Sequence, residues 1–145
     1  MTATNHYLVG VAISSVIDKP VLAIPLAFIS HFILDALPHF GDDNFRQKLP
    51  KFYLVWRVDF ILLCLALIWT LVYMPWWYAF AGFIATSPDL AWVYRLHFLE
   101  KYGKYHPPKM NKFNHFHYSI QKFESLNGIY FEIIFGVIVT IIILR

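Results

Sequence analysis

The sequence predicts an all-α integral membrane protein with about five membrane helices, the first one short, folded as a single transmembrane domain over residues 1–145. Hydrophobic residues make up 59% of the chain, charged residues only 14%, and the mean hydropathy is +0.53. This composition lies well outside the range of soluble globular proteins. The apolar residues also gather into separate segments, and the basic residues gather on one side of them.

Five apolar segments follow one another along the chain. The first is too short to cross a hydrocarbon layer of about 30 Å at about 1.5 Å per residue. The second contains Pro25, which we expect to kink it. In the fourth, the tripeptide Ser87-Pro88-Asp89 predicts that one helix ends and another begins. The five segments are residues 6–17, 20–37, 54–74, 76–94 and 126–144.

Two polar stretches separate these segments, and their charge predicts the orientation. Residues 41–51 form a polar loop, and residues 96–124 form a long basic stretch that we expect to end in a short amphipathic helix from Asn114. With five crossings, ten basic residues lie on the side of the amino terminus, against Lys19 and Arg145 on the other. The positive-inside rule then predicts a cytoplasmic amino terminus. The amino terminus lacks the basic region of a signal peptide, so we expect no cleavage there.

The stretch that suggests chemistry is Ser-His-Phe-Ile-Leu-Asp-Ala-Leu-Pro-His, residues 30–39. Positions i and i+4 share one helix face, so His31 and Asp35 project together, and His39 continues the stripe if Pro38 does not break the helix. Unpaired polar groups are costly in an apolar setting, and imidazole and carboxylate are common zinc ligands. The alternative is a helix end whose polar residues face water.

The other ionisable residues of the apolar segments map to the same, cytoplasmic, end. Such residues are rare in membranes and are candidates for function by default. His117 is preferred to its neighbour His115 because Gln121 shares its helix face, although both stay open. Helix capping or hydrogen bonding between helices could also account for the acids. The predicted metal ligands are His6, His31, Asp35, His39, Asp59, Asp89 and His117, and the acids considered for catalysis are Asp35, Asp89 and Glu132.

Several carboxylates in one apolar pocket would repel each other unless a cation held them ionised. The single cysteine, Cys64, leaves neither a disulfide framework nor a thiolate metal site. Nitrogen and oxygen ligands fit zinc first, and manganese or iron as well. The surplus of ligands suggests either two metal ions or outer residues that orient the inner ones, and the sequence leaves both open.

Four short motifs stand out along the chain: Asn5-His6, Ser30 to His39, Gly82 to Asp89, and His115 to Ser119. They resemble motifs of the small inner-membrane metal-dependent hydrolases described as LexA-binding, which are grouped loosely with zinc-dependent phospholipases C. The resemblance implies a bacterial-type inner membrane, a metal-ligating His-x-x-x-Asp pair at His31 and Asp35, and a carboxylate from Asp89. Ser87 departs from the family pattern, where leucine is usual.

These observations lead to an expected function of metal-dependent hydrolysis near the cytoplasmic leaflet, with a phosphoester or lipid-like substrate. A metal would lower the pKa of bound water towards about 7. Membrane lipids are the expected partners of the basic stretch, and nucleic-acid binding has only weak support. The alternatives are a metal-ion or proton transporter and a small accessory subunit that binds haem or another cofactor.

Overall fold

The computed structural model of the protein describes residues 1–41, 50–90 and 112–145. The described chain is mostly helical, which confirms the all-α prediction. The described residues contain one strand pairing, which is parallel and two residues long. It joins β1 (His39–Phe40) to β2 (Glu124–Ser125). The helices are α1 (Ala3–Ile17), α2 (Pro20–Asp35), α3 (Pro50–Tyr73), α4 (Trp76–Thr86), α6 (Lys112–Ile120) and α7 (Gly128–Ile143), with a 3-10 turn, η1 (Ser87–Asp89), after α4.

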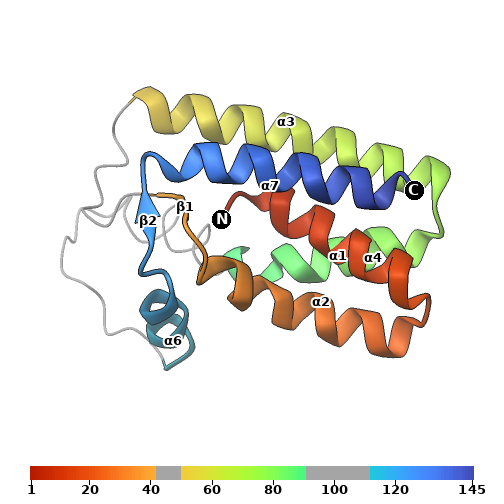
Figure 1. The fold of residues 1–145 in the computed structure, drawn as a ribbon. Helices are drawn as coiled ribbons and strands as arrows, with labels where there is room; N and C mark the ends of the chain where they lie inside the picture. The colour runs from red at the N-terminus through yellow and green to blue at the C-terminus, as the bar shows by residue number, and fades with distance from the viewer. Residues whose placement is uncertain (42–49, 91–111) are drawn as a thin grey trace.

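Five helices lie roughly side by side and form a bundle, with α1 at its centre (Figure 1). Helix α1 packs against α2, α3, α4 and α7. The amino terminus, β1, β2 and α6 lie at one end of the bundle. The carboxyl terminus, the α1–α2 turn and the α3–α4 turn lie at the other (Figure 1). We call the first of these the site end, because every residue of the candidate centre lies there.

Helices α1 and α4 approach so closely that their contact requires glycine. A Cβ atom on Gly10 would lie 2.7 Å from the carbonyl oxygen of Ala81, and one on Gly82 would lie 2.6 Å from the ring of Tyr7. Val11 and Ala81 are fully buried at the same contact. Small residues that allow backbones to approach are typical of helix packing within membranes.

The segment boundaries follow the sequence closely, with one difference that affects the site. Helix α2 runs through Pro25 without ending and stops at Asp35, two residues before the predicted end. Proline disfavours helical geometry at the residue before it, so Pro38 separates His39 from the helix. His39 therefore begins β1 instead of extending the stripe of His31 and Asp35. Residues 42–49 of the predicted polar loop 41–51 lie outside the described residues, and Pro50 and Lys51 already belong to α3. The stretch 91–111, which includes the predicted end of the fourth segment, also lies outside the described residues.

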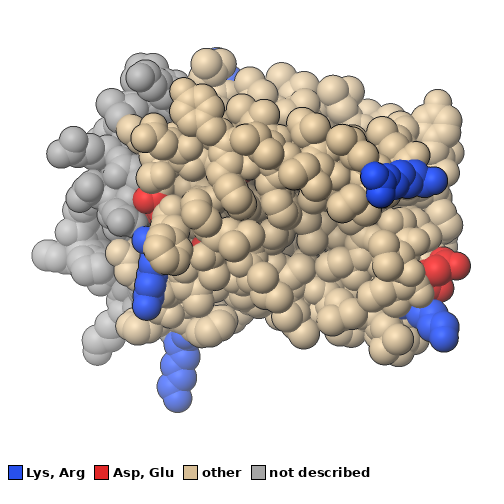
Figure 2. Space-filling model, viewed as in Figure 1, with Lys and Arg blue, Asp and Glu red and all other residues tan. Residues whose placement is uncertain are grey.

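One described helix is long and apolar enough to cross a membrane, at Tyr53–Tyr73 within α3. Three shorter apolar helices are α1, α2 and α7. Large hydrophobic side chains are exposed along these helices, among them Val21, Phe60 and Ile134. In Figure 2 the charged side chains of the described residues lie mainly towards the two ends, and a broad uncharged band lies between them.

Candidate metal centre

Four side chains from three elements meet at the site end. His31 and Asp35 come from consecutive turns of α2, Asp89 ends η1, and His117 lies in α6. One ligand atom from each of the four lies within 4.8 Å of the others, so this group could bind a metal ion. His31, Asp35 and His117 are fully buried, whereas the Asp89 side chain is 28% exposed. The predicted His-x-x-x-Asp pair thus forms one side of a closed cluster.

A backbone hydrogen bond sets the orientation of the His31 ring. His31 Nδ1 lies 2.8 Å from the carbonyl oxygen of Ala85, near the end of α4. A carbonyl only accepts, so Nδ1 carries a proton, and Nε2 is the nitrogen that can offer a lone pair to a cation in the cluster. Metal-bound histidines usually donate their other nitrogen in this way.

His117 completes the group from the opposite side. Its Nε2 lies 2.6 Å from Asp35 Oδ2 and 3.0 Å from His31 Nε2. Two lone pairs cannot face each other at this distance unless a proton or a metal ion lies between them, so the donor atoms fit a cation. Gln121, one turn further along the chain, directs its amide nitrogen at Asp35 Oδ2 from 3.2 Å. Of the two histidines left open by the sequence, His117 is buried in the cluster and His115 is exposed.

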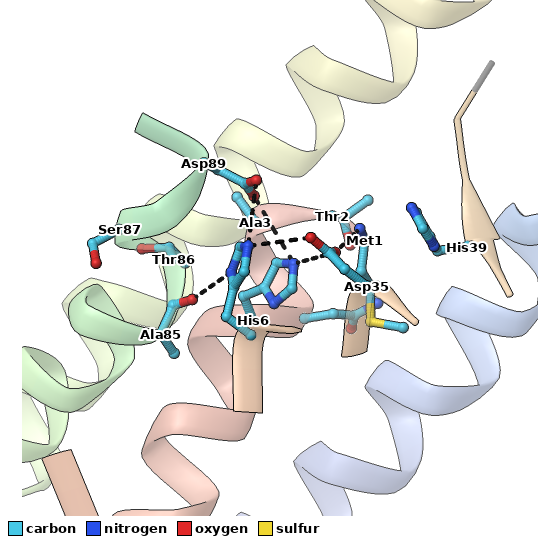
Figure 3. Close-up of polar contacts among 12 residues, drawn as sticks. Met1, Thr2, Ala3, His6, Asp35, His39, Ala85, Thr86, Ser87 and Asp89 are labelled. Carbon is cyan, nitrogen blue, oxygen red and sulfur yellow. Dashed lines mark hydrogen bonds and ion pairs between the residues drawn. The ribbon is translucent and has the colours of Figure 1, made fainter. Parts of the chain in front are cut away.

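His6 reaches the same carboxylates from α1. Its Nε2 lies 3.1 Å from Asp35 Oδ1 and 3.9 Å from Asp89 Oδ2, and its ring stacks on that of His31 at 4.0 Å between centroids. Figure 3 shows His6, Asp35 and Asp89 pointing toward one another, with His39 set apart. His6 is thus adjacent to the four-residue group without being one of its members.

The cluster concentrates negative charge in a buried place. Burial raises the pKa of Asp89 above its usual range; His31 opposes this and the Asp35 carboxylate adds to it. The amino group of Met1 lies 2.7 Å from Asp35 Oδ1 and supplies a positive charge there. A bound divalent ion would hold both carboxylates ionised for the same electrostatic reason.

Asp59 lies away from the cluster, at the amino terminus of α1. Its two carboxylate oxygens accept hydrogen bonds from the backbone N–H groups of Ala3 and Thr4, each at 3.0 Å. The first N–H groups of a helix have no partner within it, and a carboxylate there also interacts favourably with the helix dipole. Asp59 was predicted as a metal ligand, with helix capping as the alternative. In the structure it caps α1.

Glu132, on α7, is likewise bound to backbone groups. Its Oε2 accepts from the N–H of Thr2, and its Oε1 accepts from the N–H of Phe40, both at 2.8 Å. The amide of Asn5 also lies 3.3 Å from Oε2. Glu132 thus connects α7 to α1 and β1, and it is not part of the four-residue group.

His39, another predicted ligand, is buried in a separate pairing. Its Nδ1 donates to the carbonyl oxygen of Leu37 at 2.8 Å, and its Nε2 lies 3.5 Å from Glu124 Oε1. The contact with Glu124 joins β1 to β2, where His39 and Glu124 are partners in register. The strand turns His39 away from Asp35, as the break at Pro38 requires.

Comparisons of the chain with protein-family models, with curated proteins and with solved structures find no match. The description of the site therefore depends on its own geometry. The sequence could not have indicated that the carbonyl of Ala85 accepts a hydrogen bond from His31, because every residue has a backbone carbonyl. Gln121 was visible through its spacing from His117.

Proposed function

We propose that the protein is a membrane-embedded, metal-dependent hydrolase that acts on a phosphoester or lipid-like substrate at the cytoplasmic leaflet of a bacterial-type inner membrane. The observation that carries this proposal is the buried group of His31, Asp35, Asp89 and His117, whose ligand atoms lie within 4.8 Å of one another. Buried ionisable groups that converge from distant parts of a chain are typical of functional sites.

The membrane location is supported by the surface of the helices. The span Tyr53–Tyr73 is long and apolar enough to cross a bilayer, and almost none of it is buried inside the molecule. A helix that presents apolar side chains outward on this scale needs an apolar surrounding. The uncharged band of Figure 2 fits the same environment. The site would then lie at headgroup depth, which favours a lipid phosphoester as substrate.

The donor atoms favour zinc, with manganese or iron as alternatives. Imidazole nitrogens and carboxylate oxygens without thiolate suit all three ions. A divalent ion bound here would supply Lewis-acid chemistry, polarising the phosphoryl or acyl oxygen of the substrate and acidifying water. The role of His31 and His117 would be to hold that ion, each through Nε2.

Of the acids considered for catalysis, Asp89 is the best candidate to accept a proton. Its side chain is partly exposed, and its oxygens lie 3.6 to 3.9 Å from the ring nitrogens around it. Asp35 is fully buried and bonded through both oxygens. Both Glu132 oxygens accept backbone N–H groups. A general base must reach the water it activates, and partial exposure gives Asp89 that access.

The test uses purified protein in detergent with zinc or manganese and a panel of phospholipids that differ in headgroup. We expect the wild type to release product and His31→Ala to do so at a rate at least about 100-fold lower. The rate of His115→Ala, whose exposed side chain lies outside the cluster, should equal that of the wild type. Metal-loaded protein that turns over no lipid in the panel would contradict the hydrolase proposal. Equal rates in wild type and His31→Ala would contradict the site.

A further inference from the structure

The two carboxylates at the centre each present different oxygens to two sets of histidines. Asp35 Oδ2 lies 2.6 Å from His117 Nε2 and 3.2 Å from His31 Nε2, whereas Asp35 Oδ1 lies 3.1 Å from His6 Nε2. Asp89 repeats the pattern. Its Oδ1 lies 3.6 Å from His31 Nε2 and 3.9 Å from His117 Nε2, and its Oδ2 lies 3.9 Å from His6 Nε2.

This division separates the ligand atoms into two groups. One contains His31 Nε2, His117 Nε2, Asp35 Oδ2 and Asp89 Oδ1. The other contains His6 Nε2, Asp35 Oδ1 and Asp89 Oδ2. A carboxylate that binds one cation through each oxygen bridges the two, and paired sites of this kind hold ions about 3.5–4 Å apart.

We propose that the protein binds a second divalent cation between His6 Nε2, Asp35 Oδ1 and Asp89 Oδ2, so that Asp35 and Asp89 bridge two ions. With both of its oxygens bound to cations, Asp89 would hold the ions instead of accepting a proton from water. This second site extends the proposed hydrolase function and depends on the metal centre proposed for it. At this position the cation takes the place of the Met1 amino group on Asp35 Oδ1, which lies 2.7 Å away.

The coordination chemistry gives a reason for the second ion. The first group already supplies four protein ligands, which fill the tetrahedral shell of zinc, whereas catalytic zinc sites keep a position open. The second group supplies three, and so leaves room for a water or a substrate oxygen. Two divalent ions against two carboxylates also leave a net positive charge, which favours an anionic phosphoester.

The environment of His6 supports a ligand role for it. His6 is fully buried. Its Nε2 is the nitrogen directed at both carboxylates, and stacking on His31 brings the two rings alongside each other at the cluster.

The test counts metal ions on full-length protein that has been stripped with a chelator and reloaded with Mn²⁺ alone. We expect two ions per chain in the wild type, one in His6→Ala, and two in the control His115→Ala. Electron paramagnetic resonance should detect the exchange coupling of neighbouring Mn²⁺ ions in the wild type and an isolated-ion signal in His6→Ala. His6→Gln, closer in volume, serves if His6→Ala does not fold.

The possible results test the second cation site separately from the proposed hydrolase function. One Mn²⁺ per chain at saturation in the wild type, or an uncoupled spectrum with two ions bound, would overturn the second position even if lipid hydrolysis is observed. Two coupled ions in a protein that hydrolyses no lipid would support the second position and contradict the hydrolase. Two coupled ions that persist in both His6 variants would also overturn the assignment of His6.

Discussion

His31 Nδ1 donates a hydrogen bond of 2.8 Å to the carbonyl oxygen of Ala85, and this contact connects a candidate ligand of the proposed metal centre to the end of α4. The same helix end leads directly into η1 and Asp89. The end of α4 therefore sets both the orientation of His31 and the position of Asp89. This arrangement is in place without a bound ion.

This contact predicts the tautomer of His31. With ¹⁵N-labelled histidine in the zinc-loaded protein, we expect the His31 signals to report a protonated Nδ1 and a metal-bound Nε2. Assignment comes from their loss in His31→Ala. A signal from a protonated Nε2 would contradict the arrangement, because the ring would then present a hydrogen instead of a lone pair to the centre.

His117 and His115 offer a matched pair of substitutions within one helix. His117→Ala removes a buried nitrogen that lies 2.6 Å from Asp35 Oδ2, so we expect the zinc affinity to fall by 100-fold or more. His115→Ala changes an exposed side chain, and we expect its affinity to stay within two-fold of wild type. Isothermal titration of the stripped proteins measures both. Equal affinities in the two variants would remove α6 from the centre.

Gln121 is expected to tune the centre through Asp35. Its amide nitrogen donates to Asp35 Oδ2 at 3.2 Å, and residues that orient metal ligands in this way typically contribute 10- to 100-fold in affinity. Gln121→Leu, which keeps much of the volume, should therefore lower the zinc affinity by about that factor, with two-ion stoichiometry retained at saturation. An unchanged affinity would mean that Asp35 is held without it.

The sequence predicted the positions of the helices well and the site in part, for reasons that differ between residues. Of the five predicted membrane helices, only one is long and apolar enough to cross a membrane within the described residues. Apolar segments between prolines and polar stretches identify helices directly, and the spacing of His31 and Asp35 defines a shared face. His6, Asp89 and His117 were expected at the same end because topology alternates, and the structure brings them to Asp35. Asp59 and Glu132 were expected at that end too, but residue type alone cannot distinguish an acid that binds a cation from one that binds backbone N–H groups.

Asp59 provides a direct test of that distinction. In Asp59→Asn one oxygen is replaced by an amide nitrogen facing a backbone N–H of α1, so we expect the free energy of unfolding to fall by about 1–2 kcal/mol. Denaturant unfolding in detergent measures the loss. Because Asp59 does not contact the cluster, the number of bound metal ions should match wild type. Loss of an ion in this variant would restore Asp59 as a ligand.

The close contact between α1 and α4 predicts that a side chain at position 10 destabilises the fold. A Cβ on Gly10 would lie 2.7 Å from the Ala81 carbonyl oxygen, so Gly10→Ala must move two helices apart. We expect a loss of about 1–3 kcal/mol in the free energy of unfolding. The exposed Ile29, substituted by Val, is the control, with a change within about 0.5 kcal/mol. A Gly10→Ala protein as stable as wild type would contradict the close contact.

Zinc affinity should fall as the pH is lowered, because protons compete for the same donor atoms. Each ligand binds in its deprotonated form, and burial raises the pKa of Asp89, so its proton competes at a higher pH than an ordinary aspartate proton would. The affinity should therefore decrease as the pH is lowered from about 7 towards the ordinary aspartate pKa of about 4, with protons released on binding. Titration calorimetry in two buffers of different ionisation enthalpy counts these protons. An affinity that does not change across this range would mean that no titrating group of the centre binds the ion.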